Sequence, residues 1–344
     1  MENSMTHRFL GIAISALLSL FVSNAARADQ VFGYETELDV VYGTGHVAPD
    51  GTKTERELRM DVYSPSASNA DYSSSASASD GPHPAVIYVH GGAHHRGGRR
   101  VEPFRLEAAV HSRPEDYARL LAPLGYVVFV IEYRLATENP EPELSPGEAN
   151  LISDVDAYIT PQVFEATVRA RSAMGLPRLE NSPEDRLFLW KAGMAGAEDA
   201  YMALEFIIDN AERFNIDPDR IAMGGHSAGG GITLNVGLGM EAPLAAIFPL
   251  SGPGILYEHD AVKGYAKLPP ILLAYSQFDE HTQLGDLPGI ISLLRDAKAD
   301  YSLTWVPGFA HFYPHNAVSL SDDGTRMSLG DRITSFLDEH LGAK

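Results

Sequence analysis

The sequence contains no cysteine among its 344 residues. This absence excludes a disulfide framework, a thiolate nucleophile and every metal site that uses thiolate ligands. Basic residues are also scarce, with 26 lysines and arginines against 46 aspartates and glutamates and a formal net charge of −20. A chain this acidic disfavours nucleic acid and anionic membranes as partners.

Long hydrophobic runs are lacking as well. The apolar stretch at residues 9–22 falls short of the ~20 residues that a membrane-spanning helix needs. Arg8 precedes this stretch, and Ala26-Arg27-Ala28 follows it with the small-x-small pattern of a cleavage site. We therefore predict that residues 1–28 are a signal peptide and that the mature protein is exported, periplasmic or secreted, without stable membrane insertion. An uncleaved membrane anchor is the alternative.

The remaining chain has the pattern of an α/β protein. Its 44% hydrophobic content allows a large buried core. An opening hairpin is expected from residues 37–43 and 56–65. Later strands are expected at 85–90, 126–135, 220–225, 244–251, 269–276 and 301–306, and helices at 113–125, 197–214, 287–297 and 328–341. Such alternation predicts a mostly parallel central sheet with helices on both faces, formed by one domain over residues 29–344.

Two stretches depart from this alternation. The Ser/Ala-rich segment 66–81 predicts a surface loop. Residues 137–196 are longer than a direct connection from strand to helix requires. Thr160 as an N-cap, Pro161 in the first turn and apolar residues recurring from 163 to 174 predict a helix within this segment. We predict that residues 137–196 form a cap insertion over the C-terminal edge of the sheet.

The strongest chemical motif is GGHSAGGG at residues 224–231. It places Ser227 in a G-x-S-x-G frame, directly after a predicted strand and before a helix. In such a turn the serine is held in a strained conformation that projects its oxygen toward a substrate. We therefore predict Ser227 as the nucleophile of an acyl-transfer reaction.

A serine hydroxyl needs a histidine to accept its proton and a carboxylate to orient that histidine. In this strand–turn–helix arrangement the chain order is serine, acid, histidine. Asp279 follows the strand predicted at 269–276, and His311 follows the strand predicted at 301–306. Glu280 could replace the acid, and His281 or His315 could replace the base.

The segment PAVIYVHGG, residues 84–92, ends an apolar strand with two glycines. Backbone N–H groups in the loop after this strand can stabilise the oxyanion of acyl transfer, each contributing about 3 kcal/mol. Gly91 and Gly92 are predicted to supply such groups, together with the N–H of Ala228.

These motifs occur together with several others along the chain, namely HGGA (90–93), EYRLA (132–136), GAEDAYMALEFI (196–207), FNIDPDRIAMGGHSAGG (214–230), SQFDEH (276–281) and GFAHFY (308–313). As a set they resemble the α/β-hydrolase serine esterases, particularly the hormone-sensitive-lipase-like and carboxylesterase-like branch. The resemblance spans about residues 35–340.

The resemblance implies a serine esterase that needs no cofactor. It implies the triad and the oxyanion donors at the residues named above. The chain departs from the family at three positions: Ala93 replaces a third glycine, His94 replaces an aromatic residue, and His226 stands where related enzymes often carry aspartate.

The expected activity is hydrolysis of small carboxylic esters with short to medium acyl chains, through an acyl-enzyme. One alternative is an acetyl or feruloyl polysaccharide esterase, or a formamidase, with the same triad. A second is a binding protein of the same fold that lacks catalysis. The sequence gives no oligomeric state.

The remaining polar clusters have structural interpretations. The histidines at 90, 94, 95 and 111 lack a His-Glu-x-x-His spacing, so we predict no metal site. His94 and His95 are expected to line the entrance of the pocket. The basic run at positions 96, 99 and 100 predicts a solvated face, with binding of a substrate carboxylate as the alternative.

Glu198 and Asp199 open a predicted helix, where acidic side chains favour the helix dipole. In relatives this pair also supports the segment corresponding to 132–134. We expect a contact from Arg134 to Glu198 or Asp199.

Overall fold

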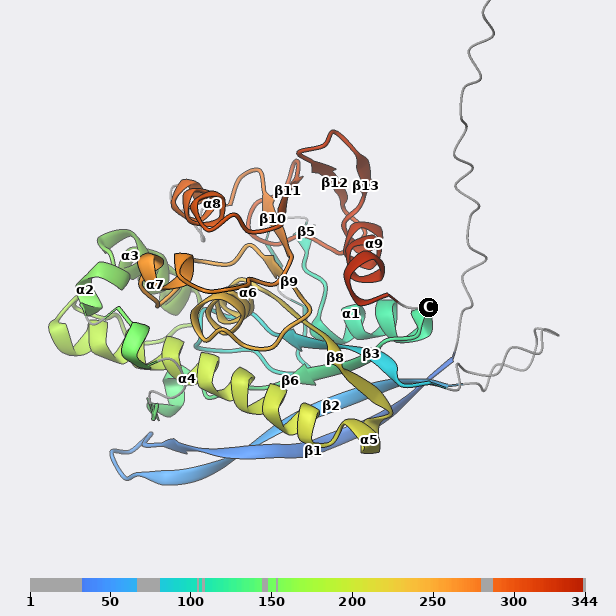
Figure 1. Cartoon of the computed structure of the whole chain (residues 1–344). Helices are drawn as coiled ribbons and strands as arrows, with labels where there is room; N and C mark the ends of the chain where they lie inside the picture. The colour runs from blue at the N-terminus through green and yellow to red at the C-terminus, as the bar shows by residue number, and fades with distance from the viewer. Residues whose placement is uncertain are drawn as a thin grey trace, which may run out of the picture. The chain divides into compact units, whose positions relative to one another are not determined.

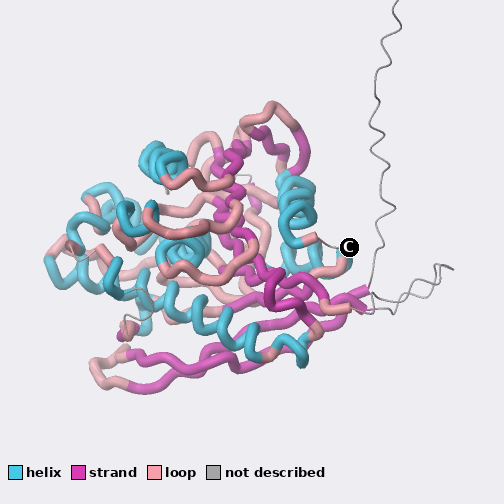
Figure 2. The backbone as a smooth tube through the Cα atoms, viewed as in Figure 1, coloured by secondary structure: helices cyan, strands magenta, loops and turns pink. Residues whose placement is uncertain are grey.

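The computed structural model describes residues 33–66, 81–103, 105–106, 109–143, 148–152, 154–279 and 287–342. The predicted signal peptide, residues 1–28, and most of the Ser/Ala-rich segment 66–81 lie outside the described residues. The elements are labelled in Figure 1 and coloured by type in Figure 2.

A large mixed sheet organises the described chain. Its strands lie in the order β13-β12-β11-β10-β9-β8-β3-β6-β2-β1-β7. The central strands run parallel to one another; they are β3 (His83–Val89), β6 (Val127–Ile131), β8 (Ile216–His226), β9 (Ala246–Leu250), β10 (Ile271–Ser276) and β11 (Tyr301–Val306). Antiparallel strands flank this parallel centre on both sides.

The predicted opening hairpin is confirmed. Strands β1 (Gly33–Val47) and β2 (Thr54–Ser66) pair antiparallel, and β2 pairs with β6. The short β7 (Pro140–Glu141) adds to the free side of β1. Two short strands, β4 (Arg105–Leu106) and β5 (Ala109–Val110), form a separate ladder.

Helices cover both faces of the sheet, and each face has its own hydrophobic core. Alternate residues of β6 divide between them: Val127, Phe129 and Ile131 belong to one core, Val128 and Val130 to the other. This division explains why the central strands are continuously apolar.

The first core packs against α4 (Pro183–Asp209), α6 (Ala228–Leu234) and α8 (Leu287–Asp296), and the second against α1 (Pro114–Leu121) and α9 (Leu329–Leu341) (Figure 1). The other α-helices of the described residues are α2 (Val155–Tyr158), α3 (Pro161–Ala173), α5 (Ala211–Phe214) and α7 (His259–Lys263). None of the helices in the described ranges combines the length and hydropathy needed to cross a bilayer.

The long helix α4 corrects a predicted boundary. It begins at Pro183, not at residue 197, so the last part of the predicted insertion 137–196 belongs to this continuous helix. The Ser182 side chain accepts a hydrogen bond from the Asp185 N–H at 3.1 Å, and the Asp185 carboxylate accepts one from the Ser182 N–H at 3.3 Å. This capping box fixes the earlier start.

Helix α3 begins where the sequence predicts. Thr160 is its N-cap, and the Thr160 Oγ1 accepts a hydrogen bond from the Val163 N–H at 3.3 Å. With α2, it occupies the segment predicted to cover the C-terminal edge of the sheet.

Strands β12 (Val318–Ser321) and β13 (Arg326–Ser328) have no counterpart among the predicted strands. In β12 the apolar residues Val318 and Leu320 are each 39% exposed, whereas Ser319 is fully buried. The Ser319 hydroxyl donates to the Met327 carbonyl and accepts from the Arg332 Nε–H. This strand therefore buries its polar side, the reverse of the usual pattern.

Candidate active site

Ser227 lies in a sharp turn between β8 and α6. Its backbone has φ 57° and ψ −118°, a left-handed φ that is strained for a residue with a side chain. The turn is tight: a Cβ at Gly229 would lie 2.1 Å from the Val89 carbonyl oxygen, so only glycine fits there. The Ser227 N–H donates to the Leu250 carbonyl at 2.8 Å, which fixes the turn against β9.

The structure brings the predicted residues Ser227, Asp279 and His311 into one hydrogen-bonded line. His311 Nε2 lies 2.8 Å from Ser227 Oγ, and His311 Nδ1 lies 2.8 Å from Asp279 Oδ1. Asp279 and His311 are each only 2% exposed. They follow β10 and β11, which are adjacent parallel strands, so their loops meet at the same edge of the sheet.

This arrangement sets the protonation of the imidazole. An ionised carboxylate only accepts hydrogen bonds, so Nδ1 carries the ring proton and donates a hydrogen bond to Asp279. Nε2 of the neutral ring is then the acceptor that faces the Ser227 hydroxyl. The line is therefore suited to withdraw a proton from the serine.

His315, which the sequence also allows as the base, is engaged elsewhere. Its ring Nδ1 lies 2.8 Å from Ser112 Oγ, and its backbone N–H donates to the same oxygen at 2.9 Å. Glu280 and His281 lie outside the described residues.

Two of the three predicted oxyanion residues, Gly91 and Ala228, lie beside the nucleophile. A Cβ at Gly91 would lie 2.8 Å from the His226 carbonyl oxygen and 3.2 Å from Ser227 Cβ, so the bare backbone of Gly91 packs directly against the turn. Ala228, the first residue of α6, lines the same cavity as Ser227. Gly92 has φ 125°, and its carbonyl accepts hydrogen bonds from the N–H groups of His95 and Arg96.

The loop after β3 continues in this unusual conformation. Ala93 has φ 55° and His94 has φ 57°, both in the left-handed region. Ala93 therefore has a backbone conformation that glycine adopts without steric cost. Two such residues in succession store strain of about 1–3 kcal/mol each, a feature that clusters at functional sites.

His226, which the sequence marks only as a departure from the family motif, holds the backbone of His311 in place. Its Nε2 lies 2.9 Å from the His311 carbonyl oxygen, for which it is the donor. The His226 ring centroid lies 3.9 Å from that of His111, whose Nδ1 lies 3.0 Å from the Tyr313 carbonyl oxygen. Burial lowers the pKa of His111 to about 3, so this ring stays neutral.

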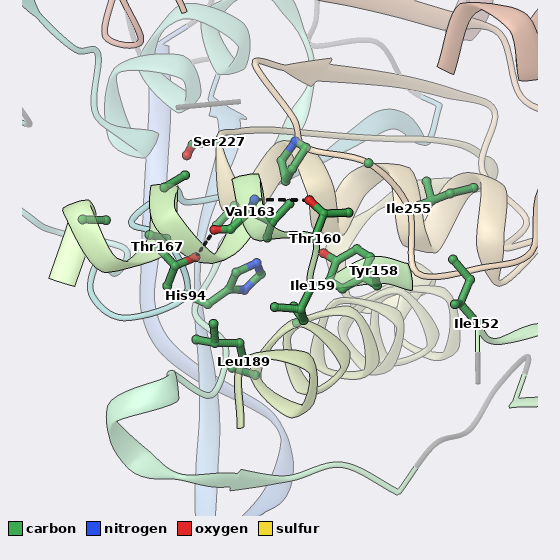
Figure 3. A pocket seen from close by; sticks show the side chains of 18 of the residues that line it. His94, Ile152, Tyr158, Ile159, Thr160, Val163, Thr167, Leu189, Ser227 and Ile255 are labelled. Carbon is green, nitrogen blue, oxygen red and sulfur yellow. Dashed lines mark hydrogen bonds between the residues drawn. The ribbon is translucent and has the colours of Figure 1, made fainter. Parts of the chain in front are cut away.

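A cavity of about 400 Å³ opens above Ser227. Figure 3 shows Ser227 at one side of it, with α3 and the start of α4 around it. Most of its lining is apolar or small; it includes Ala93, Ile152, Ile159, Val163, Ala166, Ala170, Leu189, Ala192, Gly193, Ala228, Pro253, Gly254, Ile255, Gly289 and Ile290. The predicted helix of the insertion thus forms a wall of the cavity that contains the serine.

His94 and His95, which the sequence predicts at the entrance of the pocket, both line the cavity. Burial lowers the pKa of His94 to about 3 and that of His95 to about 4, so both rings are neutral at physiological pH. Among the described residues that line the cavity there is no aspartate, glutamate, lysine or arginine. The cavity therefore suits an uncharged ligand.

The predicted contact of Arg134 is confirmed with both acidic partners. Arg134 Nε lies 2.9 Å from Asp199 Oδ1, and Nη2 lies 3.1 Å from Glu198 Oε2. Arg134 is 2% exposed and Asp199 is completely buried. Although burial lowers the pKa of Arg134, the two carboxylates raise it above its usual value. These two ion pairs hold the segment after β6 against α4.

The solvated face predicted for the basic run at positions 96, 99 and 100 is wrong for Arg99. Arg96 is exposed, but the Arg99 side chain is only 10% exposed and binds Asp39, Asp61 and Glu132. Arg100 Nε also donates to Asp61 at 2.7 Å. The protein's own carboxylates therefore occupy Arg99, which leaves no support for binding of a substrate carboxylate there.

No group of three or more histidine, aspartate or glutamate side chains is arranged to hold a metal ion within the part of the chain that the structure describes.

The comparisons with known proteins concern the fold. Residues 186–282, from α4 to the loop after β10, match a family model described as alpha/beta hydrolase fold. No curated protein matches the sequence significantly.

Similar solved structures include Thermogutta terrifontis esterase 2 phosphorylated by paraoxon, with 14% identity over 90% of this chain and 93% of that chain and a TM-score of 0.48. A second is a truncated carbohydrate esterase from gut microbiota, with 15% identity over 91% of this chain and 98% of that chain and a TM-score of 0.48. A third is the dienelactone hydrolase-like promiscuous phosphotriesterase P91 from metagenomic libraries, with 14% identity over 81% and 84% of the two chains and a TM-score of 0.45.

The matched segment contains the turn with Ser227 and the loop with Asp279. The parallel centre of the sheet, the serine in the turn after β8 and the helices on both faces agree with this match. The chain therefore has the α/β-hydrolase fold that its motifs predict.

Proposed function

We propose that the protein is an exported serine hydrolase that cleaves carboxylic esters through an acyl-enzyme. The observation that carries this proposal is the line from Ser227 Oγ through His311 to Asp279, with both contacts at 2.8 Å, beside a cavity whose described lining contains no aspartate, glutamate, lysine or arginine. Such a line is the arrangement that activates a serine hydroxyl.

In the first half of the reaction, Ser227 Oγ attacks the ester carbonyl while His311 Nε2 accepts the hydroxyl proton. Asp279 stabilises the imidazolium that forms and holds the ring in place. The protonated His311 then donates to the leaving alcohol, whose bond to the carbonyl carbon breaks. In the second half, His311 withdraws a proton from water, and the attack of that water releases the carboxylic acid and restores Ser227.

The negative charge on the carbonyl oxygen requires donors that are already in place. Gly91 and Ala228 flank Ser227, and the loop from Gly92 to His94 is held in a strained conformation. We assign the backbone N–H groups of Gly91, Gly92 and Ala228 to this oxyanion. Fixed donors contribute the most because they need no reorganisation during the reaction.

The cavity supports a neutral substrate of modest size. Its volume of about 400 Å³ lies within the range of small-molecule sites, and its wall of small and aliphatic residues suits an acyl chain. Short to medium acyl esters fit these dimensions.

The test is hydrolysis of p-nitrophenyl esters from acetyl to decanoyl by the protein without residues 1–28, beside Ser227→Ala. Loss of the nucleophile should lower kcat about a million-fold. A fluorophosphonate probe should label the wild type at Ser227 and leave the variant unlabelled. Labelling without turnover of these esters would indicate that the substrate is an amide or a polysaccharide-linked ester. Absence of both on folded protein would overturn it.

Export is the remaining part of the proposal, and it rests on the sequence of residues 1–28. Expression of the full chain in a bacterial host, followed by N-terminal sequencing of the exported fraction, should give a mature start at Asp29. A protein that stays in the cytoplasm with its first residues intact would contradict export and leave the esterase proposal unaffected.

A further inference from the structure

His94 is a polar side chain in the cavity to which the reaction gives no role. It lines the same cavity as Ser227, and Figure 3 shows both side chains there. Among the described residues, no hydrogen bond is made to either nitrogen of its ring. The Nδ1 atom is inaccessible to solvent, so Nε2 is the nitrogen that a molecule in the cavity can reach.

The burial of Nδ1 decides which nitrogen carries the proton. A buried N–H without an acceptor is rarer in proteins than a buried acceptor without a donor. The neutral ring is therefore favoured with its proton on Nε2, where a partner can approach from the cavity. In this tautomer His94 presents a hydrogen-bond donor to the ligand.

The backbone of His94 is held in a strained conformation. Its φ is 57°, and its carbonyl accepts a hydrogen bond from the Ala136 N–H at 2.6 Å. The ring lies edge-on to Tyr133, with 5.9 Å between the centroids. A polar ring in a strained loop, without a hydrogen-bond partner among the described residues, is best explained by a partner supplied by the ligand.

Three other polar residues that line the cavity have hydrogen-bond partners within the protein. Thr160 Oγ1 accepts from the Val163 N–H, and Thr167 Oγ1 donates to the Val163 carbonyl at 3.0 Å (Figure 3). His95 Nδ1 lies 2.5 Å from the Ala93 carbonyl oxygen, and its Nε2 is inaccessible. His94 is thus distinguished from these neighbours by an accessible donor that no acceptor in the described chain uses.

We propose that His94 is a specificity-determining residue whose Nε2–H binds an oxygen acceptor on the substrate. The substrate class is then an ester that is apolar overall but carries an ether, carbonyl or hydroxyl oxygen on its acyl or alcohol part. This inference rests on the proposed function, because it concerns the substrate of the same site.

The experiment compares esters that differ only by replacement of one CH2 with an ether oxygen. The acyl series pairs p-nitrophenyl hexanoate with its oxa analogues, and the alcohol series pairs alkyl butyrates with alkoxyalkyl butyrates. For each pair, kcat/KM of the oxygen-containing ester is divided by that of the plain ester. The plain ester is the internal reference, so a general loss of activity or an intrinsic difference in reactivity cancels between variants.

The variants separate the donor from the shape of the ring. His94→Phe, which removes the donor, should lower the ratio about five- to tenfold for at least one oxygen position, as expected for a neutral hydrogen bond. His94→Asn tolerates a left-handed backbone and retains an N–H donor, so it should recover part of the preference. His340→Phe is the matched control, since it makes the same change on α9, at a residue that does not line the cavity, and should leave the ratio unchanged.

A ratio that is the same in wild type and His94→Phe at every oxygen position, in both series, would overturn the inference while leaving the esterase proposal intact. If no ester is turned over, the same ratio is measured as binding to the Ser227→Ala protein by calorimetry. Equal affinities for plain and oxygen-containing esters there would also overturn it. Absence of labelling at Ser227 would instead count against the proposed function itself.

Discussion

The two sides of the cavity are built on different principles. One side, here called the floor, comprises Ser227 and the loop 90–98, with Asp279 and His311 behind the serine; the other, the cap wall, comprises residues 155–173 and 189–193. The floor consists of buried polar groups in fixed hydrogen bonds and strained backbone. The cap wall contributes mainly apolar side chains, and it has a small hydrophobic cluster of its own, formed by Ile159, Phe164, Val168 and Leu189.

From this difference we infer which side of the cavity governs turnover and which governs the choice of substrate. The floor is fixed by the sheet because its residues follow β3, β8, β10 and β11. The cap wall packs partly on itself, so its side chains can change without disturbing the line at Ser227. We therefore expect substitutions in the floor to affect turnover or stability strongly, and substitutions in the cap wall to affect the choice of substrate.

After Ser227→Ala, the largest effect is expected for Asp279→Asn, which leaves the size of the side chain unchanged but removes the charge that orients His311. The wrong tautomer then places a proton on the nitrogen facing Ser227, and kcat should fall by about 10⁴. The matched control is Glu280→Gln, because the sequence also allows that residue as the acid. Ester turnover by both variants is the measurement, and a larger loss in Glu280→Gln would reverse the assignment.

A buried ion pair next to the floor should affect stability instead. Arg134→Met leaves the buried carboxylates of Asp199 and Glu198 without their cation, and breaking such a pair costs about 3–5 kcal/mol. Urea unfolding followed by circular dichroism measures this loss. A change below about 1 kcal/mol would show that the pair is not needed for stability.

Acid should destabilise the floor and the residues packed behind it through their buried histidines. Burial lowers the pKa of His90 and His95 to about 4 and that of His111 to about 3, below the usual 6.5. The unfolded chain therefore binds more protons below pH 6.5, so stability falls as pH decreases through this window, by about 1.4 kcal/mol per pH unit for each group.

Melting temperatures between pH 7 and 4.5 test this dependence. His111→Phe keeps an aromatic ring beside His226 but removes one titrating group, so its melting temperature should depend less steeply on pH than that of the wild type. Identical slopes would mean that His111 does not contribute.

The smallest effect on stability is expected in the cap wall. Ala170→Phe adds a ring on the face of α3 that lines the cavity, which removes space for the acyl chain. The kcat/KM for octanoyl esters should fall about tenfold, since a hydrophobic pocket discriminates by about 1–3 kcal/mol per methylene, while that for acetyl esters changes little. Equal losses for all chain lengths would show that the cap wall and the floor are not separable.

The sequence predicted the floor better than the cap wall for a physical reason. Ser227, Asp279 and His311 each follow an apolar strand, and the order of parallel strands brings their ends together, so patterns within the chain were sufficient to select them. The partner of His226 was not predictable, because a histidine in that motif has no local signal for a bond to the backbone of His311.

The misplaced start of α4 has a different cause. Gly193 and Gly196 lower the helix propensity of the segment before residue 197. In the structure a Cβ at Gly196 would lie 2.8 Å from Ile232 Cδ1, so tight packing favours glycine at that position. A Cβ at Gly193, which lines the cavity, would make only ordinary contacts. The Ser182 to Asp185 capping box was the local signal that could have located the true start.

The prediction of a solvated Arg99 and the absence of β12 from the predicted strands have a common origin. Both depend on contacts between segments distant in sequence, such as Asp61 with Arg99 or Arg332 with Ser319. Hydrophobic periodicity carries no information about a buried polar side chain whose partner lies elsewhere in the chain.

The bond from His226 to the carbonyl of His311 also has a kinetic consequence. It joins residues 85 positions apart in the chain. Contacts of such sequence separation form late during folding, because closing a long loop costs entropy before the contact is gained. Refolding from urea should therefore restore the circular dichroism of the helices before it restores the reactivity of Ser227 toward a fluorophosphonate. The rate at which labelling returns would then measure the last step of folding.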